Sequence, residues 1–280
     1  MLICLLLLPL TILADGPVIS CRELEFGAGF FSVFQRFIAA LDDYEKGEVS
    51  GLEIDLGTTG LYYDAIKGPN WWGYYFEELP IQVDSSSPKV DIREKLDEYT
   101  TRGIVEIPSE RCNYLANKYL KVRQEFLQEA DEFIKNNSKD THLIGVQYRG
   151  TDKMNVEATY ISQEAAALRI KEELSRMTIP QNFKIFVATD DQLFLDAMKK
   201  EFSNKVCYFE MERSRHKELP IHLYGRSSGY IKGKEALLDC LVLSKSDFLF
   251  RTSSNLSNSA LIFNPSLPSF LLNNGVFGDR

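Results

Sequence analysis

Basic and acidic side chains gather in one short stretch near the middle of the sequence. Arg149 and Gly150 follow an apolar run, and Thr151, Asp152 and Lys153 come directly after them. Arginine forms bidentate hydrogen bonds with phosphate and keeps its charge at any working pH. Glycine lets the main chain approach a ligand closely. The stretch therefore suits a diphosphate, and a solvated turn with a local Arg–Asp pair is the alternative interpretation.

Two further polar clusters also follow apolar runs. Asp190 and Asp191 come after residues 183–188, and Ser253 and Ser254 come shortly after residues 247–250. The paired acids could cap the next helix, hold a divalent metal, or bind the hydrogen-bond donors of a sugar or of guanine. A hydroxyl-rich turn that leads into a helix presents hydroxyls and N–H groups to an anion.

Asp239 is a further candidate, because it stands among Leu237, Leu238 and Leu241. An acidic side chain in such an apolar setting usually has a partner. The alternative is a helix residue that faces water.

The second half of the chain alternates between predicted strands and helices, and this alternation positions the clusters. We expect strands at 143–148, 183–188, 206–209 and 248–250, and helices at 162–176, 192–202, 234–244 and 256–263. Such alternation is typical of a parallel sheet with helices on both faces. In these sheets ligands bind at the carboxyl ends of the strands, so we expect the chemistry among the polar residues just after each strand.

The first half of the chain shows no regular alternation of predicted strands and helices. We expect a helix within 26–41, a strand at 52–55 and one long amphipathic helix at 111–134. The stretch 60–76 is rich in Tyr and Trp, which could line an acceptor groove or pack in the core. The polar residues 135–140 are the best candidate for a linker.

Composition and charge limit the class of protein. The chain has 280 residues, 44% hydrophobic and 26% charged, which excludes disorder over most of its length. The net charge of -8 argues against general nucleic-acid binding. A local basic site for a phosphorylated small molecule remains allowed.

Residues 1–16 are predicted to be a signal peptide, cleaved near Ala14, with a buried N-terminal strand as the alternative. We therefore expect an extracytoplasmic or secretory location and no spanning membrane helix. Of the remaining cysteines, Cys21, Cys112, Cys207 and Cys240 could form two bridges by any of three pairings, although Cys207 and Cys240 fit buried thiols better. No metal site, hydrolase triad or dinucleotide-binding glycine motif is expected.

Three ordered segments resemble motifs of the α-1,6-fucosyltransferase superfamily, which includes the core fucosyltransferases of animals and the nodulation fucosyltransferases of rhizobia. Residues 145–153, GVQYRGTDK, resemble its HxRRTDK-type motif, and the similarity continues through MNVEA at 154–158. The second segment is FVATDD at 186–191, and the third comprises parts of 238–254. Gln147 stands in place of the family's His, and Gly150 in place of its second Arg.

The resemblance implies an α/β fold of the GT-B type. Two Rossmann-like domains with parallel sheets would span 17–138, on the acceptor side, and 139–280, which would hold most of the donor site. It also implies GDP-fucose as the donor, inversion at the anomeric carbon and no required metal or other cofactor. The expected partners are a nucleotide sugar and a glycan or glycoconjugate acceptor, with no nucleic acid.

The resemblance also implies roles for individual residues. Arg149 would bind the diphosphate and stabilise the leaving group, and Glu157 would take the proton from the acceptor hydroxyl. The other donor-binding residues implied are Thr151, Asp152, Lys153, Asp190, Asp191, Asp239, Ser253 and Ser254. Two alternatives stay open, namely a transferase of the same fold with another sugar nucleotide, and an inactive glycan-binding relative.

Overall fold

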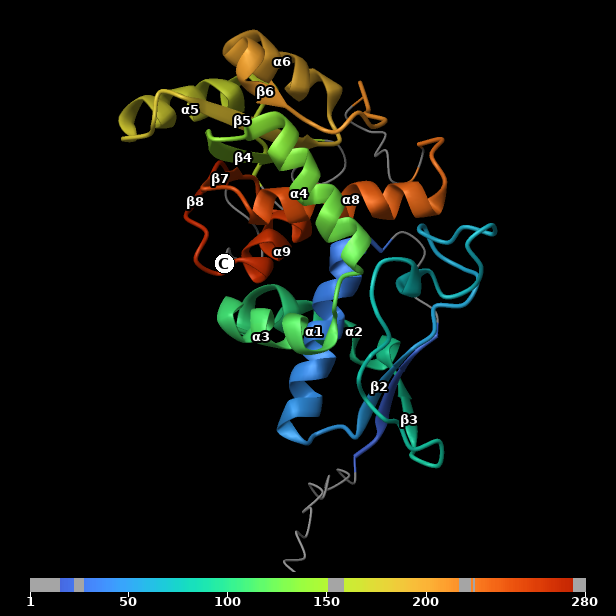
Figure 1. The fold of residues 1–280 in the computed structure, drawn as a ribbon. Coiled ribbons are helices and arrows are strands. Elements are labelled where there is room, and N and C mark those ends of the chain that lie inside the picture. The colour runs from blue at the N-terminus through green and yellow to red at the C-terminus, as the bar shows by residue number, and fades with distance from the viewer. Residues whose placement is uncertain (1–15, 23–27, 151–158, 217–222, 224, 274–280) are drawn as a thin grey trace, which may run out of the picture.

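The computed structural model describes residues 16–22, 28–150, 159–216, 223 and 225–273. It contains two parallel β-sheets, with helices packed between and around them (Figure 1). The α/β fold with parallel sheets that the sequence predicts is confirmed.

The first sheet has three strands in the order β2-β1-β3. They are β1 (Val18–Cys21), β2 (Gly51–Ile54) and β3 (Lys89–Asp91). Helix α1 (Phe30–Lys46) follows β1 and ends where Gly47 adopts a left-handed conformation, with φ 77°. The remaining elements of this half are short: η1 (Trp71–Tyr74), η2 (Ile92–Lys95), α2 (Leu96–Thr101), η3 (Arg102–Glu106) and α3 (Ser109–Tyr119).

The second sheet has five strands in the order β6-β5-β4-β7-β8. They are β4 (His142–Tyr148), β5 (Phe183–Thr189), β6 (Val206–Cys207), β7 (Phe248–Arg251) and β8 (Ser269–Leu271). All neighbouring strands pair in parallel, as predicted.

Helices cover both faces of the second sheet. The helices are α4 (Gln124–Ser138), α5 (Gln163–Arg176), α6 (Gln192–Phe202), η4 (Ser203–Lys205), α8 (Gly229–Ser244) and α9 (Asn255–Phe263). Alternate strand residues point to opposite faces. Ile144 and Val146 of β4 therefore pack in one cluster with α5 and α6, whereas Leu143 packs in the other cluster with α8 and α9.

The long helix predicted at 111–134 is wrong, because the chain forms two helices, α3 and α4, instead. The connecting residues pair with a distant segment. The N–H of Glu77 donates to the carbonyl of Lys121 at 2.8 Å, and the N–H of Arg123 donates to the carbonyl of Tyr75 at 2.9 Å. These main-chain bonds replace the helical ones, and amphipathic periodicity carries no sign of them.

Other boundaries also differ from the prediction. Helix α4 continues to Ser138 and takes up much of the predicted linker, and it packs against α8 and β5. Helix α8 begins earlier than expected, at Gly229, and β6 is shorter than the expected strand at 206–209. The division of the chain at 138/139 stays a prediction.

The aromatic stretch 60–76 packs mainly in the core. Trp71 and Trp72 are each 3% exposed, and Phe76 is fully buried. The rings of Trp72 and Phe76 stack with their centroids 4.0 Å apart. These residues therefore pack in the core and do not line an open acceptor groove.

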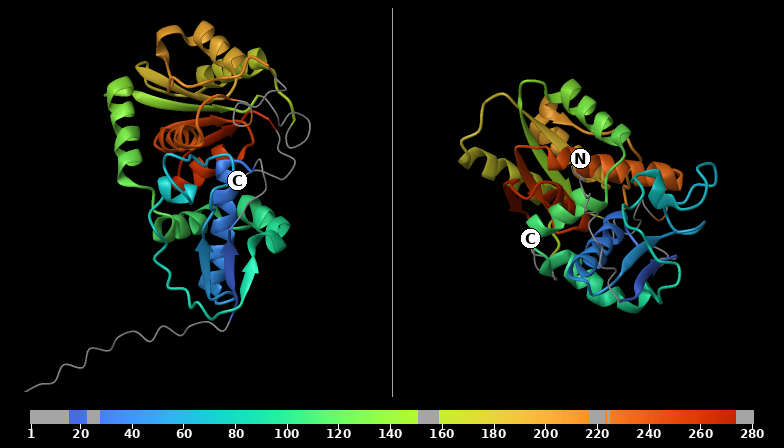
Figure 2. Two further views of the ribbon diagram at one scale, coloured as in Figure 1. Left: turned by 90° about the vertical axis from the view of Figure 1, so that its right-hand side faces the viewer. Right: turned by 60° about the horizontal axis from the view of Figure 1, so that its bottom comes forward.

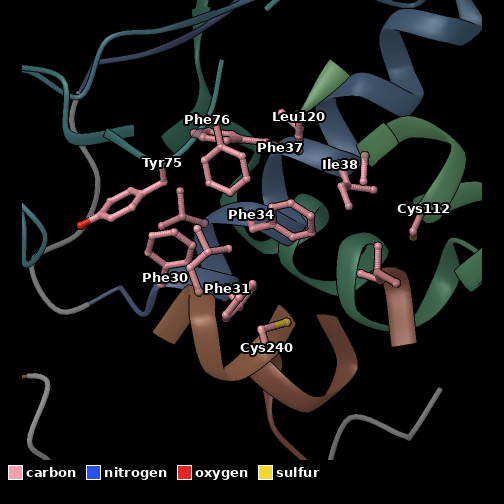
Figure 3. Packing of buried hydrophobic residues seen from close by; sticks show 14 of the residues in the cluster. Phe30, Phe31, Phe34, Phe37, Ile38, Tyr75, Phe76, Cys112, Leu120 and Cys240 are labelled. Carbon is pink, nitrogen blue, oxygen red and sulfur yellow. The ribbon is translucent and has the colours of Figure 1, made fainter. Parts of the chain in front are cut away.

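One hydrophobic cluster extends through both halves of the molecule. Phe30, Phe31 and Phe34 of α1 lie in the same cluster as Cys240 of α8 (Figure 3). Helix α1 runs from the first sheet toward the second (Figure 2, left), and the ring of Phe34 lies 5.4 Å from that of Phe263 at the end of α9. The two sheets are therefore joined by a common core.

Polar contacts reinforce the same junction. The side-chain amide of Gln35 on α1 donates to the carbonyl of Asn255 and to the hydroxyl of Ser259, both at 3.0 Å. The cysteines that the structure describes, Cys21, Cys112, Cys207 and Cys240, are all buried and are not joined in disulfides.

Two glycines of α8 allow close contact with the first half. A Cβ atom at Gly229 would collide with the carbonyl oxygen of Tyr63, and one at Gly233 would collide with the hydroxyl of Tyr75. Alanine is the better helix former by about 1 kcal/mol, so helix propensity alone would favour alanine at both positions.

We predict that Gly233→Ala lowers the free energy of unfolding by about 1–3 kcal/mol, because overpacking outweighs the gain in propensity. Urea denaturation measures this loss. Gly73→Ala is the matched control, since a Cβ there meets nothing within 4 Å. Equal stability of the Gly233→Ala variant and the control would contradict the close packing of α8 on Tyr75.

Candidate active site

The order of the strands creates a topological switch point at the carboxyl end of β4. The chain passes from β4 to β5 and β6 on one side, and then returns to β7 and β8 on the other side. In open parallel sheets, ligands bind where the strand order reverses in this way. The residues that follow β4 and β7 therefore flank the expected binding position.

The register brings the polar clusters together at that position. Tyr148 at the end of β4 pairs with Thr189 at the end of β5, and Gln147 pairs with Arg251 of β7. Arg149, the residue that follows β4, forms an ion pair with Asp190, with Nη1 and Oδ2 3.0 Å apart. The ends of these three strands therefore lie together at one edge of the sheet.

Thr252 ties the ends of β4 and β7 together. Its hydroxyl accepts the N–H of Arg149 at 2.9 Å and donates to Oε1 of Gln147 at 3.0 Å. Its own N–H donates to the carbonyl of Gln147, also at 3.0 Å. Gln147, which stands in place of a histidine in the motif it resembles, thus helps to hold the main chain of Arg149.

Gly150 lies against two side chains and leaves no space for a larger residue. A Cβ atom there would come within 2.5 Å of both Oδ2 of Asp191 and Cε1 of Tyr148. The second arginine of the motif that this segment resembles would not fit here without a rearrangement. Arg149 therefore supplies the positive charge at the described end of β4.

Asp191 acts as the N-cap of α6. Its Oδ1 accepts the N–H groups of Leu193 and Phe194 at 2.7 and 3.1 Å. Its Oδ2 accepts the side-chain amide of Gln163 at 2.7 Å. These bonds engage both oxygens of a carboxylate that is only 3% exposed, so capping accounts for its position.

Ser253 and Ser254 lead into α9. Ser254 is the N-cap, and its hydroxyl accepts the N–H of Ser257 at 3.1 Å. The N–H of Ser253 donates to Oδ1 of Asn273 at 2.8 Å. The first turn of α9 follows Thr252 closely, so the positive end of its dipole lies near Arg149.

Asp239 of α8 reaches the same region from one face of the sheet. It is 6% exposed, and no described residue forms a hydrogen bond with its Oδ1. Burial raises the pKa of this carboxyl well above its ordinary value. The negative charges of Glu235 and Asp190 raise it further, whereas the positive charge of Arg213 lowers it. A buried acceptor of this kind suits a ligand that brings N–H donors.

Two further residues bear on this region, namely Arg213, which the sequence analysis missed, and Tyr62, which belongs to the aromatic stretch 60–76. Arg213, in the segment after β6, donates through its guanidinium to three main-chain carbonyls. The hydroxyl of Tyr62 is buried in the first half of the chain and accepts the N–H of Phe30 at 2.7 Å. Burial raises the pKa of Tyr62 to about 12, and the positive charge of Arg149 acts in the opposite direction.

Some predicted residues cannot be placed. Thr151, Asp152, Lys153 and Glu157 lie outside the described residues, so their roles stay predictions.

Within the described ranges, no group of three or more His, Cys, Asp and Glu side chains could hold a metal ion. Among the helices of those ranges, none has both the length and the apolar character to cross a membrane.

We predict that Thr252→Val destabilises the protein by about 1–3 kcal/mol, because it leaves the N–H of Arg149 and Oε1 of Gln147 without their shared partner. Thr252→Ser keeps the hydroxyl and loses one methyl group, so it should cost only about 0.8 kcal/mol. Urea denaturation distinguishes the two. A valine variant as stable as the serine variant would contradict the role given to the hydroxyl.

Comparison with solved structures gives the same architecture. A structure of the NodZ alpha-1,6-fucosyltransferase soaked with GDP-fucose matches with a TM-score of 0.59 and 15% identity, covering 95% of this chain and 100% of that one. NodZ from Bradyrhizobium matches with a TM-score of 0.58 and 14% identity, covering 88% and 93%. The apo form of POFUT1 matches with a TM-score of 0.52 and 9% identity, covering 92% and 98%.

These likenesses show that the chain has a GT-B fold. No curated protein sequence matches it. The family model for the alpha-(1,6)-fucosyltransferase N- and catalytic domains matches residues 86–257, which include the strand ends described above. The chain therefore belongs to the alpha-(1,6)-fucosyltransferase family and is a glycosyltransferase.

Proposed function

We propose that the enzyme transfers fucose from GDP-fucose to a hydroxyl of a glycan or glycoconjugate, with inversion at the anomeric carbon. The observation that carries this proposal is the position of Arg149, at the carboxyl end of the central strand β4 and beside the switch point. Membership of the family and the fold shared with a NodZ structure soaked with GDP-fucose support the choice of donor.

The leaving group of this reaction is a nucleoside diphosphate, whose negative charge grows as the bond to the sugar breaks. Arg149 and the positive end of the α9 dipole would stabilise that charge. The ion pair with Asp190 orients the guanidinium before the donor arrives, so little reorganisation is needed. Ser253 and Ser254 would add donors to the phosphates, and no metal is required in this scheme.

Buried acids would hold the rest of the donor. Oδ1 of Asp239 forms no hydrogen bond with any described residue. It would accept hydrogen bonds from the N–H groups of guanine or from the hydroxyls of fucose. Asp190, beside Arg149, would also accept hydrogen bonds from the donor. Asp191 would act mainly through the shape of the loop, since its oxygens cap α6 and bind Gln163.

The acceptor needs a base. We propose Glu157 for this role on the motif that it matches, with Thr151, Asp152 and Lys153 in support of the donor. A carboxylate that takes the hydroxyl proton as the new bond forms contributes by general base catalysis. Residues 139–280 would bind the donor and residues 17–138 the acceptor, and the apolar segment 1–16 would direct the enzyme to the secretory pathway.

A second candidate is a transferase that uses another sugar nucleotide. Gly150 favours it, because the packed side chains of Asp191 and Tyr148 exclude the family's second arginine. A single arginine at the end of β4 recognises a diphosphate less specifically than two would. An inactive glycan-binding relative is the third possibility, and it would bind glycans without turnover.

The test is release of the nucleoside diphosphate by the purified chain from a panel of GDP- and UDP-sugars, with glycan acceptors present. We predict release from GDP-fucose, with kcat/KM lowered about 10²–10³-fold in Arg149→Ala. Arg149→Lys should recover part of the loss, because lysine keeps the charge without the bidentate geometry. Glu157→Gln should lower kcat and leave the affinity for GDP unchanged.

Arg176→Ala serves as the control, because this arginine lies on α5 with its side chain 66% exposed. Release from another donor alone would move the assignment to the second candidate. The absence of both turnover and GDP binding, the latter measured by calorimetry, would contradict the proposal. That result would favour the glycan-binding relative.

A further inference from the structure

Asn273 joins two segments at the edge of the sheet where the donor is proposed to bind. It follows β8, the edge strand beside β7. Its Oδ1 accepts the N–H of Ser253 at 2.8 Å, and its Nδ2 donates to the carbonyl of Thr159 at 3.0 Å. One amide group therefore connects the donor loop, defined as residues 252–254, with the first described residue after 158.

Hydrogen bonds fix the residue that precedes Asn273. The N–H of Leu272 donates to the carbonyl of Arg251 on β7 at 2.8 Å. The carbonyl of Leu272 accepts Nη1 of Arg169 on α5, also at 2.8 Å. Asn273 therefore extends from a part of the chain that is bonded to both β7 and α5, so its amide can hold two other segments at a fixed separation.

The segment that leads into α5 is tied to the strand ends at two further points. The hydroxyl of Tyr148, at the end of β4, donates to the carbonyl of Ile161 at 2.8 Å. The side-chain amide of Gln163 donates to Oδ2 of Asp191, after β5, at 2.7 Å. Together with the bond from Asn273, these contacts place the segment relative to the ends of β4, β5 and β8.

The donor loop is bonded to the chain on both sides of residues 151–158. Before them, the hydroxyl of Thr252 accepts the N–H of Arg149. After them, Ser253 is joined to Thr159 through Asn273. Both connections start from adjacent residues of one loop, so a shift of that loop acts on both sides.

We infer that Asn273 is a positioning residue of the transfer reaction, which sets the place of Thr159 relative to the donor loop. This inference rests on the proposed function, because Glu157 is proposed as the base on its motif. Glu157 lies two residues before Thr159 in the sequence, so the place of Thr159 limits where that carboxylate can be. A misplacement of about 1 Å can lower a rate about 10²-fold.

The first experiment separates rate from donor affinity in the full chain. Asn273→Ala removes both bonds, whereas Asn273→Asp keeps an oxygen for the N–H of Ser253 and loses the donor to Thr159. Both variants should lower kcat at saturating GDP-fucose by about 10–100-fold, and the alanine variant should bind GDP within about threefold of the wild type. The aspartate variant carries the same test of kcat if the alanine variant fails to fold.

A double variant tests whether the effect acts through the proposed base. In the Glu157→Gln background, Asn273→Ala should lower kcat less than about twofold further, because both changes act on the same proton transfer.

Asn264 provides a matched control at the C-terminal end of α9. Its Nδ2 donates to the carbonyl of Ser244, and its Oδ1 accepts the hydroxyl of Ser266, both at 2.9 Å. Asn264→Ala therefore also removes two hydrogen bonds of an asparagine amide. It should lose a similar amount of thermal stability and keep the kcat of the wild type.

The second experiment needs no ligand, so it separates a failure of this inference from a failure of the proposed function. The N–H of Tyr160 belongs to the same peptide group as the carbonyl of Thr159, so its NMR signal reports the bond to Asn273. Asn273→Ala should shift the amide signals of Ser253 and Tyr160 and speed the hydrogen exchange of Ser253. Asn273→Asp should shift Tyr160 and keep Ser253 protected, and Asn264→Ala should shift neither.

An unchanged kcat in Asn273→Ala would overturn the inference, as would an equal loss of kcat in Asn264→Ala or additive effects with Glu157→Gln. Weaker GDP binding that accounts for the whole loss of rate would also overturn it, since Asn273 would then serve the donor alone. If the wild type turns over no donor while the amide signals respond as expected, the proposed function fails and the link from Ser253 to Thr159 through Asn273 stands.

Discussion

Strands β4, β5 and β7 run parallel in a register that ends them at the same edge of the sheet. Tyr148 lies opposite Thr189, and Gln147 lies opposite Arg251. The residues that follow these strands therefore lie close together. In this chain those residues are charged or carry hydroxyls. Partly buried charges that lie close together are stabilised by partners of opposite sign, and Arg149 pairs with Asp190 in this way.

The rest of the structure keeps this edge in place. The hydroxyl of Thr252 joins β4 to β7, and Asp191 caps α6 while it binds Gln163 of α5. The aromatic core around α1 extends to α8, which carries Asp239, and to α9, which is capped by Ser254. The same core contains Tyr62 of the first half, and Gln35 of α1 donates to the carbonyl of Asn255 at the start of α9. The site is thus built where the two halves of the molecule meet.

Much of this arrangement follows from sequence patterns, because the patterns are local. Alternating apolar runs predict the strands of the second sheet, and the rule for parallel sheets then directs attention to the residues that follow them, Arg149 and Asp190 among them. Long-range contacts leave no such pattern. The break between α3 and α4 depends on main-chain bonds to Tyr75 and Glu77, and the position of Arg213 depends on a segment that folds back on β5.

At other positions the sequence leaves the role of a residue open for a different reason. The same residue type suits both a binding site and a structural role. Trp71 and Trp72 suit a sugar-binding groove as well as a core, and only their burial decides between the two. Gly150 looks like a point of close ligand approach, yet its neighbours are Asp191 and Tyr148. The capping role of Asp191 was one of several open interpretations until its bonds to α6 were seen.

The central claim is that the carboxyl ends of β4, β5 and β7 bind a nucleoside diphosphate. Titration of the isotope-labelled chain with GDP, followed through its backbone amide NMR signals, tests this claim residue by residue. We predict the largest shifts at Arg149, Asp190 and the residues from Thr252 to Ser254, and smaller shifts in Arg149→Lys at equal GDP concentration. Shifts confined to other parts of the chain, or no shifts at millimolar GDP, would contradict it.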